Sequence, residues 1–477
     1  MSKRSDDGLQ RSGGELPREA ADRFTRPFAR FLKIEAATGV LLAVAACAAL
    51  VLSNSPWSQA FLTFWETPLG FRFGTLDFSR PLRHWFNDGP MTLFFFVVPL
   101  ELKRALVRGE LRSFRMAAFS FAGAVGGMAL PAGLYLALMH GKPGAHGWGT
   151  VMATDTAFVM GALALLGARI PGSLRLFLLS LAIFDDVGAI VIVAVGYGEH
   201  LSWPALAGAA ACMAVIFGAA RIGIRAVPFY VLFGAGMWLA FDASGLHPTV
   251  AGVVLGLMTP TKEWVNNERL HAIFRRVLAH PTGDETSSNA QGRAELRRAG
   301  VAAREALSPV ERLELKLHPW SGFVIMPTFA LANAGVILSW EGIADPIATA
   351  VVAGLVLGKP LGVLGMSWLA TRTGLATRPS SLKWSVLAAG SVLTGIGFTM
   401  SLFIAGLAFG ATPSLIAAKT GILASSILAG VCGVLALHWM TVPKDEHTRT
   451  PHDSRATDRS TATSAPDAKA ATNRRIE

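Results

Sequence analysis

Charged side chains are scarce in this sequence. Of its 477 residues only 16% are Asp, Glu, Lys or Arg, whereas 52% are hydrophobic. Average soluble domains carry about 25% charged residues. The apolar residues also come in blocks of about 20, the length that a helix needs to cross a bilayer. The composition argues against a soluble globular protein and predicts an all-α polytopic membrane protein.

Several other features are missing. The sequence has no repeated segments of about 10 residues with alternating polarity, which a membrane β-barrel would need. Its three cysteines lie inside apolar blocks without metal-binding spacing, so neither a disulfide framework nor a soft-metal site is expected: Cys47, Cys212 and Cys432. Residues 1–30 lack the apolar core of a cleaved signal peptide. No bound cofactor is expected.

The net charge of +11 raises the question of nucleic-acid binding. Lys and Arg lie mainly between the apolar blocks and in the two ends, where they set orientation in a membrane. They are more frequent in the loops that face the cytoplasm if the N-terminus is inside. We therefore expect no nucleic-acid partner, and we predict a multi-pass protein of the bacterial inner membrane with both termini in the cytoplasm.

The chain divides into a polar tail at 1–28, a transmembrane domain at 29–443 and a second polar tail at 444–477. Both tails are predicted to be disordered and cytoplasmic. The domain holds about 12 candidate membrane helices and a long, charged cytoplasmic loop at 260–317. The helices are predicted at about 32–54, 86–107, 115–140, 148–168, 173–197, 203–220, 227–242, 247–259, 319–339, 347–371, 384–409 and 416–441. In the first outer loop, Phe71–Phe78 alternates around a glycine. This pattern predicts a β-hairpin, with an irregular surface loop as the alternative.

Two adjacent acids, Asp185 and Asp186, interrupt an otherwise apolar block. Ionisable groups inside a membrane helix are costly, at about 2.5–3.5 kcal/mol on insertion scales, and usually have a function. Repulsion between neighbouring carboxylates favours protonation of at least one of them. Such a pair holds either a proton or a cation. The alternative is a pair of acids that merely cap a buried helix end.

Polar and glycine residues also interrupt two other blocks, at Thr154-Asp155 and at Gly395 and Gly397. Both patterns predict broken helices, which present backbone carbonyls and dipole ends to an ion in transporters. The alternatives are an Asp that only caps a half-helix and glycines that only allow close helix packing. A hard cation such as sodium prefers oxygen ligands, and Asp185, Asp186 and Thr154 offer them.

Lys359 lies in the middle of another apolar block. A cation at this depth needs a partner, and Asp185 or Asp186 is the obvious candidate. The alternative is a lysine that extends to the membrane surface.

These segments resemble the NhaA-type sodium/proton antiporters, in the order of that family, over about residues 30–441. The matching segments are Leu100–Arg104, Ala153–Phe158, Ala182–Ile190, Leu317–Trp320, Phe329–Val336, Gly358–Gly362 and Gly395–Ser401. The resemblance implies inverted repeats, two broken helices that cross at mid-membrane, and electrogenic exchange of sodium or lithium for more than one proton. Transport rather than enzymatic catalysis is thus the expected activity, serving pH and sodium homeostasis.

The resemblance also implies residue roles. Asp186 matches the principal ion-binding acid, and Asp185 matches the neighbour that pairs with the charge-compensating lysine, here Lys359. Glu101 and Glu314 match acids linked to the pH response, and the hairpin in the first outer loop matches a homodimer contact. For Glu101 the alternative is a pairing with Arg104 on the same helix face. Ala105 replaces an acid that is usual at the entrance, which removes one pH-responsive group.

Three other functions are alternatives to sodium/proton exchange. An intramembrane aspartyl protease needs a Gly-x-Gly-Asp segment, which the sequence lacks. A cation channel is disfavoured by the lysine beside the acids. Exchange of another monovalent cation, or of calcium, for protons stays open from the residues alone.

Overall fold

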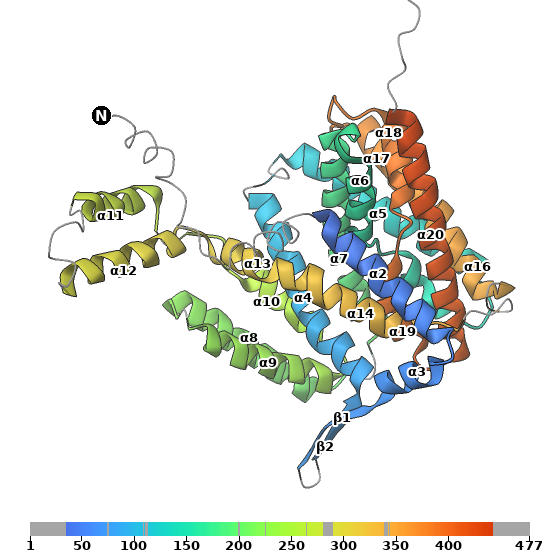
Figure 1. The fold of residues 1–477 in the computed structure, drawn as a ribbon, viewed down its shortest axis with the longest axis horizontal. Coiled ribbons are helices and arrows are strands. Elements are labelled where there is room, and N and C mark those ends of the chain that lie inside the picture. Colours follow the sequence, from blue (N-terminus) through green and yellow to red (C-terminus); the bar gives the residue numbers. More distant parts are fainter. Residues whose placement is uncertain are drawn as a thin grey trace, which may run out of the picture. The chain divides into compact units, whose positions relative to one another are not determined.

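The computed structural model describes residues 35–441, apart from gaps at 74–75, 108, 110–112, 199–200, 225, 264, 280–289, 338–341 and 343. The tails predicted at 1–28 and 444–477 lie outside the described residues. The described part consists of helices and one two-stranded sheet (Figure 1). This agrees with the prediction of a helical membrane protein.

The helices before residue 260 are α2 (Glu35–Ser53), α3 (Ser58–Glu66), α4 (Leu82–Val107), α5 (Phe114–Leu138), η2 (Ala145–Val151), α6 (Thr156–Leu166), η3 (Gly167–Arg169), α7 (Gly172–Gly196), α8 (Trp203–Ile222), α9 (Val227–Ser244) and α10 (Val250–Met258). Those after it are α11 (Asn267–Ala279), α12 (Ala290–Glu305), α13 (Pro309–Trp320), η5 (Ser321–Ile325), α14 (Met326–Asn333), α16 (Pro346–Val352), η6 (Ala353–Gly358), α17 (Lys359–Arg372), α18 (Trp384–Leu393), α19 (Phe398–Phe409) and α20 (Pro413–Thr441).

Within the described residues, 7 helices are long and apolar enough to cross a membrane, or up to 9 if two bent pairs each count as one span. The other predicted spans coincide with α4, α10 and α14, which do not pass that test. The reason is plain for two of them, since α10 has 9 residues and α14 has 8. The polytopic helical fold is thus found, while the full number of spans is not fixed by helix length and composition.

Both segments predicted to be broken are interrupted in the structure. The 3₁₀-helix η2 ends at Val151 and α6 begins at Thr156. Helices α18 and α19 are separated by residues 394–397 and bend by 50°. The glycines and hydroxyl side chains at these points offer the backbone alternatives to helical hydrogen bonds.

Two further irregularities were not predicted. The π-helices η5 and η6 each lead directly into a helix with proline near its first position, Pro327 in α14 and Pro360 in α17. Proline lacks an N–H, and its ring collides with the carbonyl four residues earlier. A wider π-turn removes that conflict without ending the helix. The second π-turn places Lys359 at the start of α17.

The hairpin predicted in the first outer loop is present. Strand β1 (Pro68–Phe73) pairs antiparallel with β2 (Leu76–Pro81), and Phe71 lies opposite Phe78. This result rules out the alternative of an irregular loop. The short helix α3, which precedes the hairpin and buries Trp65, was not predicted.

The charged segment predicted as a loop at 260–317 contains α11, α12 and the first part of α13. Ser308 and Glu311 form a capping box at the start of α13. Glu314 therefore lies on a capped helix that leads into η5 and α14.

Helices α5 and α17 pack most closely where glycines face each other. A Cβ atom at Gly126 would collide with the backbone oxygen of Gly362, and one at Gly362 would collide with that of Gly126. Small residues allow such backbone contact between membrane helices. This packing fixes α17, and with it Lys359, against α5.

Candidate ion-binding site

Asp185 and Asp186 lie near the middle of α7 and are almost fully buried, with 0% and 4% of their surface exposed. Apolar residues continue on both sides of them within the same helix. They are therefore not acids at a buried helix end, which was the alternative considered from the sequence.

Lys359 pairs with Asp185. Its Nζ atom lies 2.7 Å from Asp185 Oδ2, and both side chains are 0% exposed. The ammonium also donates a hydrogen bond to the backbone oxygen of Met152, in the break between η2 and α6. Lys359 is thus held between α7 and a broken helix and does not extend to a membrane surface.

Thr154 lies in the same break. Its hydroxyl is 2.6 Å from Asp185 Oδ2 and 3.3 Å from the backbone oxygen of Thr394, in the second break. A hydroxyl can donate only one proton. Of the two oxygens, the carboxylate oxygen of Asp185 is both closer and the stronger acceptor. Thr154 therefore donates to Asp185, while its own lone pairs remain available to a cation.

Asp155 connects the two broken helices. It caps α6 by accepting from the Phe158 N–H at 3.1 Å. Its other oxygen accepts from the N–H of Thr399 at 3.0 Å and from the Thr399 hydroxyl at 2.5 Å. The Asp155 N–H in turn donates to the Ile396 oxygen at 2.7 Å. Both oxygens are occupied, so the geometry fits the alternative in which Asp155 caps a half-helix and does not bind the ion.

Gly395 and Gly397 lie where the second break meets its neighbours. A Cβ atom at Gly395 would come within 2.6 Å of the Leu355 backbone oxygen. One at Gly397 would collide with the Ser401 side chain and lie 3.2 Å from the Ala153 oxygen. Close backbone approach thus requires glycine at Gly395, whereas at Gly397 the collision is mainly with the Ser401 side chain. At Gly395 the helix break and close packing, which the sequence left as alternatives, occur together.

Two carboxylate oxygens at this site lack a hydrogen-bond partner. Asp185 Oδ1 and Asp186 Oδ1 are both buried and unpaired. Buried polar atoms are normally satisfied, and an ionised oxygen needs a proton or a cation. The part of the chain that the structure describes holds no group of three or more His, Cys, Asp or Glu side chains arranged for a metal. Two carboxylates and a hydroxyl instead suit protons or a small, hard cation.

The predicted pH-responsive acids lie at the end of α4 and on α13. Glu101 Oε1 is 2.9 Å from His318 Nδ1, and Arg104 Nε is 3.1 Å from Glu314 Oε2. The pairing of Glu101 with Arg104 on one helix face, considered from the sequence, is therefore not what the structure shows. Burial raises the pKa of Glu314 to about 7, although the nearby Arg104 guanidinium opposes that rise. Glu101 also interacts electrostatically with Asp186 on α7.

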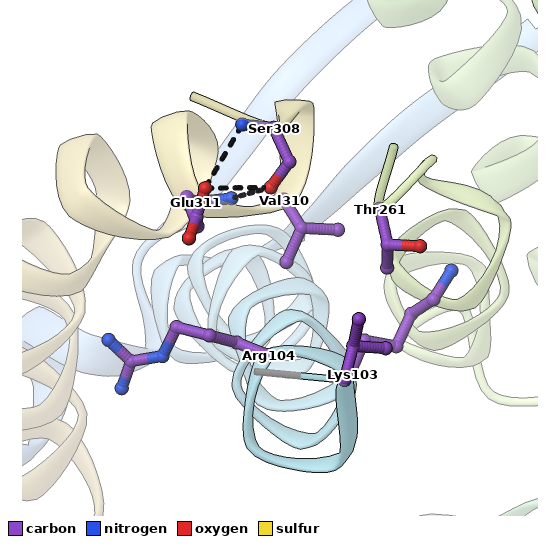
Figure 2. A pocket seen from close by; sticks show the side chains of 7 residues that line it. Lys103, Arg104, Thr261, Ser308, Val310 and Glu311 are labelled. Carbon is purple, nitrogen blue, oxygen red and sulfur yellow. Dashed lines mark hydrogen bonds between the residues drawn. The ribbon is translucent and has the colours of Figure 1, made fainter. Parts of the chain in front are cut away.

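A small hollow lies beside this cluster, between the end of α4 and the start of α13. Figure 2 shows Lys103 and Arg104 pointing away from each other there, with the Ser308–Glu311 capping box on the opposite side. Lys103 donates to the backbone oxygens of Leu257 and Thr259 at 2.8 and 2.6 Å and so secures the end of α10. Neither Asp185 nor Asp186 lines the hollow.

Sequence reasoning missed three participants in these contacts. Thr399 was one of several hydroxyls in a quoted segment, but its bond to Asp155 was not foreseen. The Met152 carbonyl and His318 were not singled out either. A His in a polar segment and a backbone oxygen carry no signal of their own, because only the packing of distant helices supplies their partners.

A family model described as Na+/H+ antiporter 1 matches residues 29–437. The chain belongs to this antiporter family. It is 58% identical to "Na(+)/H(+) antiporter NhaA" of Rhizobium meliloti over 90% of this chain and 98% of that protein. It is 55% identical to "Na(+)/H(+) antiporter NhaA 1" of Acidiphilium cryptum, over 89% and 94%. With "Na(+)/H(+) antiporter NhaA 2" of Vibrio vulnificus the identity is 48%, over 89% and 95%. Membership in the NhaA family confirms the resemblance found from the sequence segments.

Proposed function

We propose that this protein exchanges sodium ions for protons across the bacterial inner membrane and that Asp185 and Asp186 carry the exchanged ions. The observation that carries the proposal is the pair of buried carboxylates with unpaired oxygens beside two interrupted helices. Membership in the NhaA antiporter family supports sodium as the cation.

The exchange is a competition for the same oxygens. With the site open to the cytoplasm, the acids lose protons and bind sodium through carboxylate oxygens and Thr154. With the site open to the other side, sodium leaves and protons return. Each bound state excludes the other, so the two fluxes run in opposite directions. Asp186, whose Oδ1 has no donor, is the principal ligand, and Asp185 is shared between the ion and Lys359.

Lys359 has a second role in this scheme. When the site is empty, its ammonium offsets the charge of Asp185 at 2.7 Å. When sodium binds, the ammonium is repelled and releases a proton. This would make exchange electrogenic, with more than one proton per sodium, and an inside-negative potential would drive the cycle. Lithium, another small hard cation, is the expected alternative substrate.

The proposed architecture has twelve spans related by inverted repeats, with both termini in the cytoplasm. The number of spans is supported by the described helices. Length and composition allow up to nine spans, and α4, α10 and α14 coincide with the three remaining apolar blocks. In this arrangement the hairpin lies outside, and Glu101 and Glu314 lie at the cytoplasmic entrance.

A homodimer through the hairpin is also proposed. Its two strands each have one edge without a partner strand among the described residues, and such edges readily pair with a second copy. Replacing the hairpin with a short flexible linker should yield monomers in light scattering. Unchanged dimers would place the interface elsewhere.

The decisive experiment uses everted vesicles or proteoliposomes that hold a pH gradient reported by a fluorescent probe. Addition of sodium or lithium should collapse the gradient, whereas potassium and calcium should not. Asp186→Asn should abolish the response. Asp345→Asn is the matched control, because Asp345 caps α16 and Asn is an equally good cap.

Each alternative function gives a different result. A response to potassium or calcium would identify another cation/proton antiporter. Sodium flux without any change in pH would identify a channel. Sodium-dependent exchange retained in Asp186→Asn would refute the assignment of the site.

A further inference from the structure

A second buried lysine, Lys419 on α20, is not part of the candidate ion site. Only 6% of its surface is exposed, and within the described residues it has neither a hydrogen bond nor an ion pair within 4.0 Å. Lysine is almost never buried without a partner. Lys359, which is buried to a similar degree, has Asp185. Lys419 therefore needs an acceptor that its own chain does not supply.

The charged groups nearest to Lys419 lie on α3 and α4. Lys419 interacts electrostatically with Arg83 at the start of α4 and with Glu66 at the end of α3. Glu66 is already engaged, since its Oε1 atom lies 2.8 Å from Arg83 NH1. One carboxylate thus faces two basic side chains, Arg83 and Lys419.

The same junction holds two further donors without acceptors. Arg83 Nε and Trp65 Nε1 are both buried and unpaired. Trp65 precedes Glu66 in the chain, and its ring packs edge-on against Phe86, one turn beyond Arg83 on α4. Helix α3 packs against α4, and Figure 1 shows the hairpin that connects them. Lys419 thus lies within electrostatic range of Arg83 and Glu66, and Trp65, the residue before Glu66, adds an unpaired indole N–H.

These groups select an anion with several acceptor oxygens. A cation is repelled, and a neutral group leaves one of the two basic side chains without a counter-charge. Phosphate presents several charged oxygens to arginine and lysine donors. The site is also open on one side, because the side chains of Arg83 and Glu66 are 25% and 53% exposed. Tryptophan is enriched at the level of lipid headgroups, where phosphates lie.

We propose that Lys419, Arg83 and Trp65 form a phosphate-binding site, occupied either by the headgroup of a phospholipid or by free inorganic phosphate. It lies on the hairpin side of the molecule, apart from Asp185 and Asp186. The proposal does not depend on the transported ion.

The test uses the full chain, purified and stripped of lipid, with phosphatidylglycerol, inorganic phosphate or chloride added separately. Its unfolding temperature and the phospholipid that it retains are measured. Phosphatidylglycerol should raise the unfolding temperature of the unmodified protein. Lys419→Gln and Arg83→Gln should bind about tenfold more weakly or worse, the loss expected for one charge-assisted hydrogen bond. Lys142→Gln, which alters an exposed lysine, should behave like the unmodified protein.

The outcomes separate the two sources. A shift with phosphatidylglycerol alone identifies a lipid site, and an equal shift with inorganic phosphate identifies a free-anion site. Equal stabilisation of all variants would overturn the proposal, because the ligand would then bind elsewhere. So would a lack of any response, which would mean that Lys419 is buried as a neutral amine.

Two further variants control for misfolding and for dependence on the ion site. If Lys419→Gln does not fold, Lys419→Arg should fold and retain binding because it keeps the charge, and loss of binding in a folded Lys419→Arg would count against the proposal. Asp186→Asn should retain full phosphate binding. Failure of sodium exchange and failure of this site would thus be seen separately.

Discussion

Removal of either partner of the Lys359–Asp185 pair should destabilise the protein more than removal of both. Nζ and Oδ2 are 2.7 Å apart, and both side chains are 0% exposed. In Lys359→Met, Asp185 Oδ2 keeps only the Thr154 hydroxyl at 2.6 Å, and Oδ1 has no donor. In Asp185→Asn, the ammonium loses its counter-charge. Loss of one partner from a buried pair costs about 3–5 kcal/mol.

The double variant Asp185→Asn/Lys359→Met lacks both charges of the pair and keeps Asp186 as the remaining buried acid of the site. Replacing both members of a buried pair by neutral groups of similar size is often nearly neutral for stability. The two single effects should therefore not add, and their coupling should be about 3 kcal/mol.

The measurement is denaturant unfolding of the four proteins in one detergent at one pH, which yields a double-mutant cycle. Lys383→Met, which alters an exposed lysine before α18, is the control and should change the unfolding free energy by less than about 0.5 kcal/mol. Additive single effects would show that the two charges are not coupled in the folded protein, and the reasoning from their distance would be wrong. Sodium exchange should be lost or strongly reduced in the double variant even though its stability is restored.

The remaining predictions concern Glu314 and the broken helices. Because burial raises the pKa of Glu314 to about 7 from an ordinary 4.5, the folded protein binds a proton that the unfolded chain has released. Stability from this group is fully present below pH 4.5 and is lost as pH rises through about 7. The unfolding midpoint should therefore fall less over this range in Glu314→Gln than in the unmodified protein, whereas Glu268→Gln, at an exposed position of α11, should follow the unmodified protein. Gly395→Ala should lower the unfolding temperature and sodium exchange, since its Cβ would lie 2.6 Å from the Leu355 oxygen. Gly406→Ala, on α19 with no atom within 4 Å of the new Cβ, should change neither, and equal effects of the two substitutions would refute the steric explanation.

Much of the fold could be predicted because bilayer physics acts on sequence directly. Apolar blocks of sufficient length must be helical, so the predicted blocks fall on the observed helices. The hairpin followed from alternation around Gly74, which is a local signal. The π-helices and α3 were missed, since their form depends on how prolines and a buried Trp65 fit against neighbouring helices.

The residues of the candidate site could be predicted from the sequence, but most of the contacts between them could not. Asp185, Asp186, Lys359, Thr154 and Asp155 are conspicuous because polar groups in apolar helices are costly. The residues alone left open which acid pairs with the lysine, and the family resemblance implied Asp185. The structure brings Lys359 to Asp185 across 174 positions of sequence. The roles of these residues in transport stay predictions until the exchange experiment is made.

The sequence by itself determined that this is a helical membrane protein, that two of its helices break, and that it belongs to the NhaA antiporters. These properties follow from hydrophobic length, local polar interruptions and short segments, all of which are written along one stretch of chain. Only the tertiary structure decided that Asp155 bonds to Thr399, that Glu101 meets His318 rather than Arg104, and that Lys419 is buried without a partner. Those outcomes depend on which helices pack together, because a buried charge is satisfied only by whatever the neighbouring helix presents to it.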